Sequence, residues 1–113
     1  MPKRNDQLLL EDIAEAIDDI MNFTHDLTYE EFAADKKTFN AVIRSLTVIG
    51  EAANRLSTEI TAPHNEIEWQ KVVAFRNRLV HEYFGIDYEM VWEIIKNYLT
   101  TLKKYVQKIL SEL

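Results

Sequence analysis

The stretch that decides the fold is KKTFNAVIRSLTVIGEAANRLSTEI, residues 36–60. Its apolar side chains recur every three or four residues, at Phe39, Val42, Ile43, Leu46, Ile49, Ala53, Leu56 and Ile60. Side chains with this spacing share one face of an α-helix, so the sequence predicts a long amphipathic helix over residues 36–60. Gly50 lies inside this helix at a cost of roughly 1 kcal/mol relative to alanine. We interpret it as a point where a neighbouring helix passes too close for a side chain.

The segments before residue 36 show the same periodicity. Residues 6–23 carry one apolar stripe, made of Leu9, Ile13, Ile17, Ile20 and Met21, which predicts a first helix. Thr28 is followed at the third position by Glu31, the spacing of a capping box, in which a hydroxyl and a carboxylate bond each other's free backbone N–H groups. We therefore expect a short second helix through residues 32–34.

The segments after residue 60 predict two further helices. Pro63 marks the clearest break in the chain, and a helix over residues 66–84 is expected to end at Gly85, the residue type favoured just past a helix. Asp87 is placed to cap a last helix whose apolar stripe is Val91, Ile95, Tyr98, Leu102, Tyr105 and Ile109. The predicted fold is all-α: a single domain over residues 1–113, an up-and-down bundle of four long helices and a short one. Its wide apolar faces indicate a buried subunit interface, so we expect a dimer.

Composition narrows the class of protein. The 113 residues include only four that break regular structure (Pro2, Pro63, Gly50 and Gly85), so loops must be few and short. The absence of cysteine excludes a disulfide scaffold and thiolate chemistry. No stretch approaches the roughly 20 apolar residues of a membrane span, and the N-terminal segment does not have the pattern of a secretory signal. We expect a cytoplasmic protein without a membrane partner.

The net charge of −6 disfavours a general electrostatic nucleic-acid binder, and we expect no DNA partner. The charge is uneven, however. Residues 1–70 hold 6 basic and 14 acidic groups, whereas residues 71–113 hold 7 and 5. Any site for a polyanion is therefore expected in the C-terminal part.

The segment WQKVVAFRNRLVHEYF, residues 69–84, carries the chemistry. On a helix Arg76 falls at the centre of the apolar face and Tyr83 almost directly beneath it, while Asn77 and His81 lie along one edge. A charged guanidinium in an apolar stripe needs either a carboxylate partner, such as Glu51, or an opening onto a polar cleft. His81 either bonds Asn77 one turn earlier or moves protons, and Tyr83 either packs in the core or serves a site.

Arg76 and His81 differ by about 140° and about 7.5 Å along one helix, so a single chain cannot point both at one atom. Two symmetry-related helices in a dimer groove would allow it. Arginine would then hold phosphate oxygens in a bidentate fork, and histidine would move the proton of a ribose 2′-OH.

The run RNRLVHEY, residues 76–83, resembles the signature of HEPN-domain ribonucleases, in particular the HepT toxin family: an arginine and a histidine separated by four residues, then one residue and a tyrosine. Residues 48–57 (VIGEAANRLS), 67–77 (IEWQKVVAFRN) and 81–92 (HEYFGIDYEMVW) are similar to that family as well, so the resemblance covers essentially the whole chain.

The resemblance implies a homodimeric helical bundle that cleaves RNA, with tRNA a reasonable substrate, and needs no metal or cofactor. It implies that Arg76 and His81 are catalytic and that Asn77 supports them. It also implies the toxin subunit of a type VII-like HEPN/MNT toxin–antitoxin pair, in which a cognate nucleotidyltransferase antitoxin silences the toxin by transferring AMP to Tyr83. Glu51 is a weaker candidate, for which an exposed ion pair with a neighbouring arginine is the plainer role.

Other chemistries lack their motifs. His25, His64 and His81 are widely separated and form no pair of metal ligands on one helix, and there is no glycine-rich phosphate loop. Two other hypotheses remain: a non-catalytic adaptor or substrate-binding subunit of a nucleotidyltransferase, which would keep Tyr83 as a contact, and a plain structural bundle in which Arg76 and His81 are replaceable.

Overall fold

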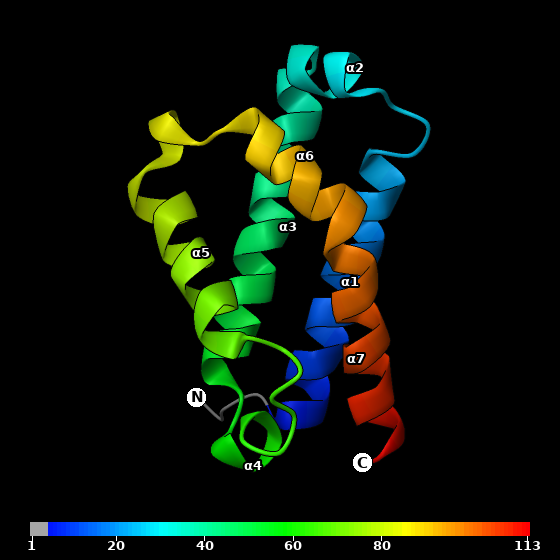
Figure 1. The fold of residues 1–113 in the computed structure, drawn as a ribbon, viewed down its shortest axis with the longest axis vertical. Coiled ribbons are helices and arrows are strands. Elements are labelled where there is room, and N and C mark those ends of the chain that lie inside the picture. Colours follow the sequence, from blue (N-terminus) through cyan, green and yellow to red (C-terminus); the bar gives the residue numbers. More distant parts are fainter. Residues whose placement is uncertain (1–4) are drawn as a thin grey trace.

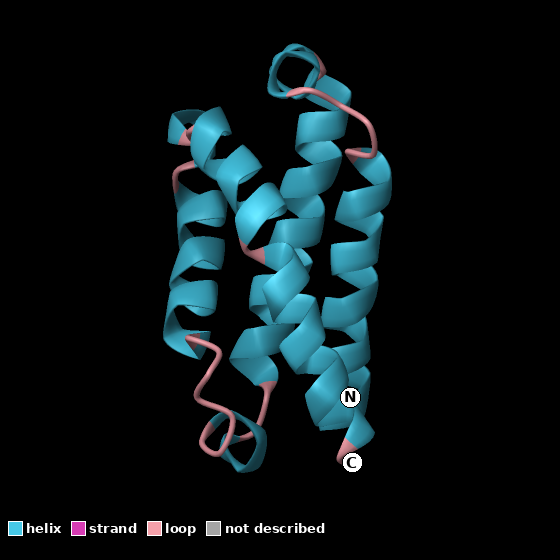
Figure 2. Cartoon of the chain, turned by 45° about the vertical axis from the view of Figure 1, so that its right-hand side comes forward, coloured by secondary structure: helices cyan, strands magenta, loops and turns pink. Residues whose placement is uncertain are grey.

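A computed structural model describes residues 5–113, and every regular element in that range is a helix (Figures 1 and 2). The all-α prediction is thus confirmed. In chain order the elements are α1 (Asp6–Phe23), α2 (Tyr29–Ala34), α3 (Lys36–Arg55), α4 (Thr58–Thr61), α5 (Trp69–His81), the 3₁₀ turn η1 (Tyr83–Gly85), α6 (Tyr88–Asn97) and α7 (Leu99–Ser111). Pro2 lies outside the described residues, and no helix within them is long and apolar enough to cross a membrane.

Helix α3 is the central element of the bundle. It packs along α1 on one flank and against α5 on another, and α7 packs on α1 (Figure 1). The predicted stripes of α1 and α3 form the core, in which Ile13, Ile17 and Ile20 of α1 and Val42 of α3 are almost fully buried. Each such side chain contributes about 1.5–3 kcal/mol through burial. The fold therefore holds α3 firmly and presents its remaining surface between α1 and α5.

An aromatic cluster joins α2, α3 and α6 at one end of the bundle. The predicted capping box of Thr28 and Glu31 is present, and it starts the short helix that buries Phe32 completely. Phe32 meets Phe39 of α3 edge to face, with ring centroids 5.8 Å apart, and lies against Trp92 of α6 at 5.1 Å. This cluster fixes the end of α3 from which the functional groove described below begins.

Helix α3 ends at Arg55, five residues earlier than the sequence predicts. Leu56 is buried but has an extended backbone, and Ser57 donates both its backbone N–H and its hydroxyl to the Asp6 carboxylate, at 2.9 Å and 2.6 Å. A side chain 51 positions away thus takes the bonds that a continuing helix would need. Residues 58–61 form the separate short helix α4.

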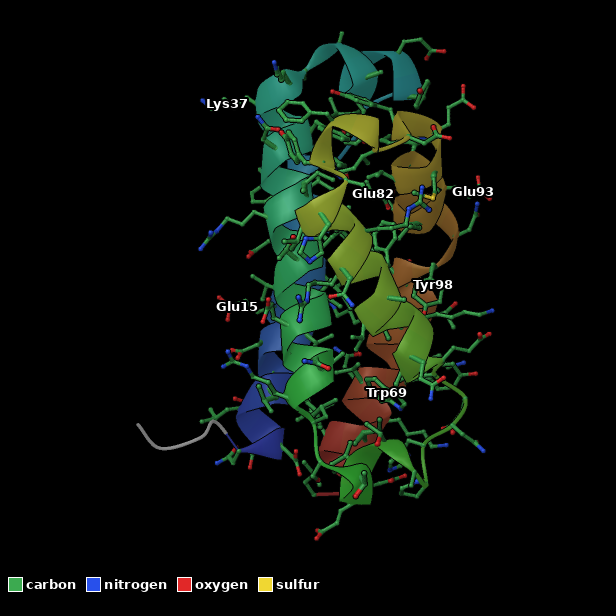
Figure 3. All side chains as sticks on the ribbon, turned by 90° about the vertical axis from the view of Figure 1, so that its left-hand side faces the viewer. Glu15, Lys37, Trp69, Glu82, Glu93 and Tyr98 are labelled. Atoms are coloured by element: carbon green, nitrogen blue, oxygen red, sulfur yellow. The ribbon has the colours of Figure 1, made fainter. Side chains whose placement is uncertain are left out.

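The predicted helix over residues 66–84 is shorter at both ends, since α5 runs from Trp69 to His81 (Figure 3). Glu82 leaves the helical conformation, with φ −126° and ψ 37°, and Tyr83 therefore lies in η1 rather than beneath Arg76. Gly85 ends η1, and not the helix as predicted. Its φ is not positive, so the position does not require the left-handed backbone conformation that favours glycine.

The last predicted helix is divided at Tyr98. Asp87 caps α6 as expected, accepting from the backbone N–H groups of Glu89 and Met90. At Tyr98 the backbone departs from helical geometry, with φ −117°, and α7 begins one residue later. The break rotates the apolar face by one position, so that Leu99 and Val106 are buried while Tyr98 is exposed and Tyr105 is half-buried.

Candidate functional site

Arg76 lies on α5 at the closest approach of α5 to α3. Its side chain is only 18% exposed, and its Nε lies 3.5 Å from Oε1 of Glu51, whose side chain is 44% exposed. A Cβ placed on Gly50 would stand 2.1 Å from Cβ and 2.7 Å from Cγ of Arg76. The predicted close passage at Gly50 is thus confirmed, and the residue that needs the space is Arg76 itself.

The electrostatics of Arg76 are unusual for a buried arginine. The 3.5 Å contact with Glu51 does not form a hydrogen bond, and Nε of Arg76 is the one buried side-chain nitrogen or oxygen without a hydrogen-bond partner in residues 5–113. A buried donor left in this state costs about 1–3 kcal/mol. The fold therefore holds a charged guanidinium in place, beside a carboxylate, without using all of its donor capacity.

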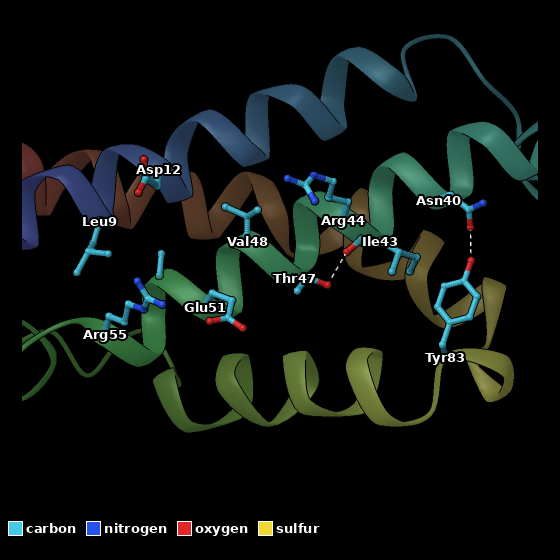
Figure 4. Close-up of a pocket in the computed structure, with 11 residues that line it drawn as sticks. Leu9, Asp12, Asn40, Ile43, Arg44, Thr47, Val48, Glu51, Arg55 and Tyr83 are labelled. Carbon is cyan, nitrogen blue, oxygen red and sulfur yellow. Dashed lines mark hydrogen bonds between the residues drawn. The ribbon is translucent and has the colours of Figure 1, made fainter. Parts of the chain in front are cut away.

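A groove of about 580 Å³ runs along α3 on the side that faces α1 and η1 (Figure 4). Its floor is largely apolar, formed by Leu9, Ile43, Val48 and Ala52. Its polar lining consists of Asp12 of α1, of Asn40, Arg44, Thr47, Glu51 and Arg55 of α3, and of Tyr83 of η1. Glu51 therefore belongs to both sites: it lines the groove and it pairs with Arg76.

Tyr83 stands at one end of this groove. Its hydroxyl donates a hydrogen bond to Oδ1 of Asn40 (Figure 4). Its ring meets that of Phe84 edge to face, with ring centroids 5.4 Å apart. Tyr83 is 37% exposed and Phe84 fully exposed, so the interpretation of Tyr83 as a core residue is wrong. The tyrosine hydroxyl is instead oriented by α3 at a site that a partner can reach.

His81 and Asn77 are both exposed on α5, whereas the helical pattern placed them along one edge of the helix. His81 is the last residue of the helix, and Figure 3 shows its neighbour Glu82 at the turn that leads to η1. Within the described residues, neither side chain forms a hydrogen bond or ion pair, so the bond between His81 and Asn77 that the sequence allowed is not made. The structure brings Arg76 to Glu51 and Tyr83 to Asn40, and it joins His81 to neither pair.

Asn40 is the site residue that sequence reasoning missed. It lies 43 positions before Tyr83, and no local pattern links an exposed asparagine on α3 to a tyrosine in a 3₁₀ turn. Gly50, in contrast, carried a signal, since a glycine inside a strong helical stripe requires a packing reason. In residues 5–113 no group of three or more histidine, cysteine or acidic side chains is arranged to hold a metal ion.

The chain is similar to known proteins along most of its length. A family model described as "HepT-like: Ribonuclease HepT-like" matches residues 13–109. A Methanocaldococcus jannaschii protein named "Putative RNase MJ0127" is 41% identical over 113 residues, covering 100% of this chain and 93% of its own. A Thermococcus cleftensis protein named "Probable ribonuclease HepT" is 41% identical over 107 residues, covering 95% of this chain and 97% of its own. No solved structure gives a significant match.

Proposed function

Because this chain belongs to the HepT-like ribonuclease family, we propose that it cleaves RNA without a metal ion and that Arg76 and His81 carry the reaction. The observation that best supports a functional Arg76 is its packing against Gly50. A side chain at position 50 of α3 would displace this arginine, and glycine leaves the space open. A purely structural ion pair can often be replaced as a whole by well-packed apolar residues without loss of stability.

In the proposed reaction the ribose 2′-oxygen attacks the adjacent phosphorus while the bond from phosphorus to the 5′-oxygen breaks. The products are a 2′,3′-cyclic phosphate and a free 5′-hydroxyl. His81 takes the proton of the 2′-OH or supplies the proton of the leaving 5′-oxygen, as histidine does in general acid–base catalysis. Arg76 stabilises the negative charge that develops on the phosphoryl oxygens. Asn77, next to Arg76 on the exposed side of α5, would contact the same phosphate or sugar.

The active unit we propose is a homodimer. His81 is exposed at the end of α5 and Arg76 is held in the contact between α5 and α3, so one chain does not direct both at one phosphate. A twofold axis would set each patch against its copy and supply the second group from the partner. The exposed Val80 and Phe84 beside His81 give such an interface apolar area.

We further propose that the chain is the toxin of a toxin–antitoxin pair, silenced by AMP transfer to Tyr83 from a nucleotidyltransferase. The Tyr83 oxygen would attack the α-phosphorus of ATP, pyrophosphate would leave, and the phenolic proton would pass to a base of the partner. Support comes from the exposure of Tyr83 and from Asn40, which orients its hydroxyl at the mouth of a groove large enough for a nucleotide. The product adds negative charge and bulk at the site.

The test is cleavage of total RNA and of purified tRNA by the protein in EDTA. We expect cleavage by the wild type, loss in Arg76→Ala and His81→Ala, and no change in Arg78→Ala, whose side chain is exposed and pairs with Glu82 outside the site. Circular dichroism and sedimentation must show that each variant is folded and of the same mass. Cleavage that persists in the folded Arg76 and His81 variants would refute the assignment.

A non-catalytic adaptor of a nucleotidyltransferase is separated from the toxin by the same assay. An adaptor would gain the mass of AMP when incubated with the partner and ATP, and would lose that gain in Tyr83→Phe, yet it would not cleave RNA. The proposed toxin shows both behaviours, and its cleavage falls once Tyr83 is modified.

A further inference from the structure

We infer that the groove along α3 binds a single strand of RNA and that Arg44 and Arg55 hold its phosphates; this rests on the proposed ribonuclease function. Both arginines line the groove and both are exposed (Figure 4). In the described residues neither forms a hydrogen bond or an ion pair with a protein group. Their donors are therefore available to a ligand.

The state of these two arginines differs from that of the other two arginines in residues 5–113, Arg76 and Arg78. Arg76 pairs with Glu51, Arg78 with Glu82, Lys71 with Glu68 and Lys103 with Asp18. In a chain with 19 acidic and 13 basic residues, an unpaired arginine is not forced by a shortage of carboxylates. Two of them line one groove, whose other charged residues are Asp12 and the Glu51 that pairs with Arg76, and guanidinium forks match phosphate oxygens.

The spacing of Arg44 and Arg55 favours a strand over a single nucleotide. The two residues lie 11 positions apart on α3, so their Cα atoms are about 16 Å apart at the rise of an α-helix. One phosphate cannot serve both. A stacked strand advances about 3.4 Å along its axis per nucleotide, so about five nucleotides cover this distance, and a more extended strand needs fewer.

The remaining lining divides the groove into two sides. Asn40, Thr47 and Glu51 lie on the same helix as the arginines, and Glu51 is paired with Arg76, whereas Asp12 lies on α1 opposite them. A carboxylate repels phosphate, which favours phosphates on the side of the two arginines. We therefore place the phosphates along α3 and the bases over the apolar floor toward α1.

The groove reaches the carboxylate that pairs with Arg76, although neither Arg76 nor His81 lines it. Glu51, the partner of Arg76, lies between Arg44 and Arg55 along α3, and Tyr83 borders the end near Asn40. A strand held by the two arginines thus passes the carboxylate that touches the catalytic guanidinium. A phosphate attached to Tyr83 would sit at the end of this path and repel the strand, which gives the proposed modification a direct way to block binding.

The test measures binding of a fluorescein-labelled 2′-O-methyl oligonucleotide of mixed sequence, which lacks the attacking hydroxyl. Anisotropy titrations from 50 to 300 mM salt would compare wild type, Arg44→Gln, Arg55→Gln, the double variant, and Arg78→Gln as the matched control. Loss of a phosphate contact lowers the slope of log K against log salt by about 0.7 for single strands, so the double variant should lose about 1.4. Affinity at 0.1 M salt should fall about tenfold for each arginine removed.

The outcomes distinguish failure of the RNA-binding inference from failure of the proposed function. If the groove variants bind with the affinity and salt slope of Arg78→Gln while the wild type cleaves RNA, the inference is wrong and the proposed function stands. If the groove variants change the sedimenting mass instead of RNA binding, the groove is a contact between two copies and the inference again fails. A wild type that binds the strand through both arginines but never cleaves RNA refutes the proposed function alone.

Discussion

Replacement of Gly50 by alanine tests the contact on which the site depends. In an unobstructed helix this change stabilises by about 1 kcal/mol, because alanine has the higher helix propensity. At Gly50 the new Cβ would lie 2.1 Å from Cβ of Arg76. Carbon atoms in contact are normally about 3.5–4.0 Å apart, so α5 and α3 must separate by at least about 1.4 Å at this point. The obstacle is the root of the Arg76 side chain and cannot rotate away.

The gain in helix propensity and the cost of the steric clash together decide whether Gly50→Ala stabilises or destabilises the protein. Overpacking in a well-filled contact costs about 1–3 kcal/mol, and the shift also moves Arg76 away from Glu51. We expect Gly50→Ala to lower the free energy of unfolding by about 1–2 kcal/mol, which corresponds to a melting temperature about 3–8 °C lower. The melting temperature would be measured by circular dichroism at fixed protein concentration.

The effect on catalysis should exceed the effect on stability. A misplacement of about 1 Å in a catalytic group costs about 100-fold in rate. We therefore expect kcat for RNA cleavage to fall about 100-fold in Gly50→Ala at a temperature where the variant is fully folded, with a smaller change in KM. Arg76→Ala already lacks the guanidinium, so adding Gly50→Ala to it should cost little further activity.

The chain supplies its own control for this prediction. A Cβ on Gly85 would meet nothing within 4 Å, so Gly85→Ala should leave the melting temperature nearly unchanged. The double variant Gly50→Ala with Arg76→Gly transfers the missing side chain from α3 to α5, and it should recover part of the lost stability without recovering activity. The reasoning is refuted if Gly50→Ala raises the melting temperature, as it would in a helix without the contact.

Three further changes probe the same region. Glu51→Gln leaves the guanidinium of Arg76 without a charged partner, and we expect a loss of about 1 kcal/mol in urea unfolding; an unchanged midpoint would mean that the ion pair is not formed. Asn40→Ala removes the hydrogen bond that holds Tyr83, so amide exchange in residues 82–86 should become faster while α1 is unaffected; unchanged exchange would exclude this role. Hydrogen bonds from Thr38 hold the pKa of the Asp35 carboxyl below its usual value, so the stability that this cap gives α3 is lost as pH falls through that pKa. Asp35→Asn should therefore lower the dependence of the melting temperature on pH in the acid range. Equal slopes of melting temperature against pH for the variant and the wild type would contradict this role.

Periodicity predicted the helices of this protein well because each long helix buries one continuous stripe. It failed where a distant side chain decides the backbone. Asp6 binds Ser57 across 51 positions and ends α3, and no window of sequence around residue 57 contains that partner. The predicted stripe of the last helix was wrong at Tyr98, because the break in the helix turns Leu99 to the core and leaves Tyr98 exposed.

The residues of the candidate site were likewise predicted only in part. The helical pattern placed Arg76 on the buried face and named Glu51 as a possible partner, which the structure confirms. The position of Tyr83 was wrong because Glu82 leaves the helix, and Asn40 could not be found because helical wheels give the face of each helix but not the register between helices. Register comes from tertiary packing, here from the fit of Arg76 over Gly50.

The net charge of −6 constrains how this protein can use RNA as a substrate. A surface with that charge repels a polyanion at long range, so binding must come from a few short contacts, not from a broad field. If Arg44 and Arg55 are those contacts, each chain contributes a salt slope of only about 1.4, far below that of proteins that neutralise six to ten phosphates. Weak attachment of this kind leaves selection to the shape of the groove and to the bases over its floor. One phosphate added at Tyr83 by the proposed modification would then be a large fraction of the total binding charge, and we expect a single modification to be enough to close the groove to RNA.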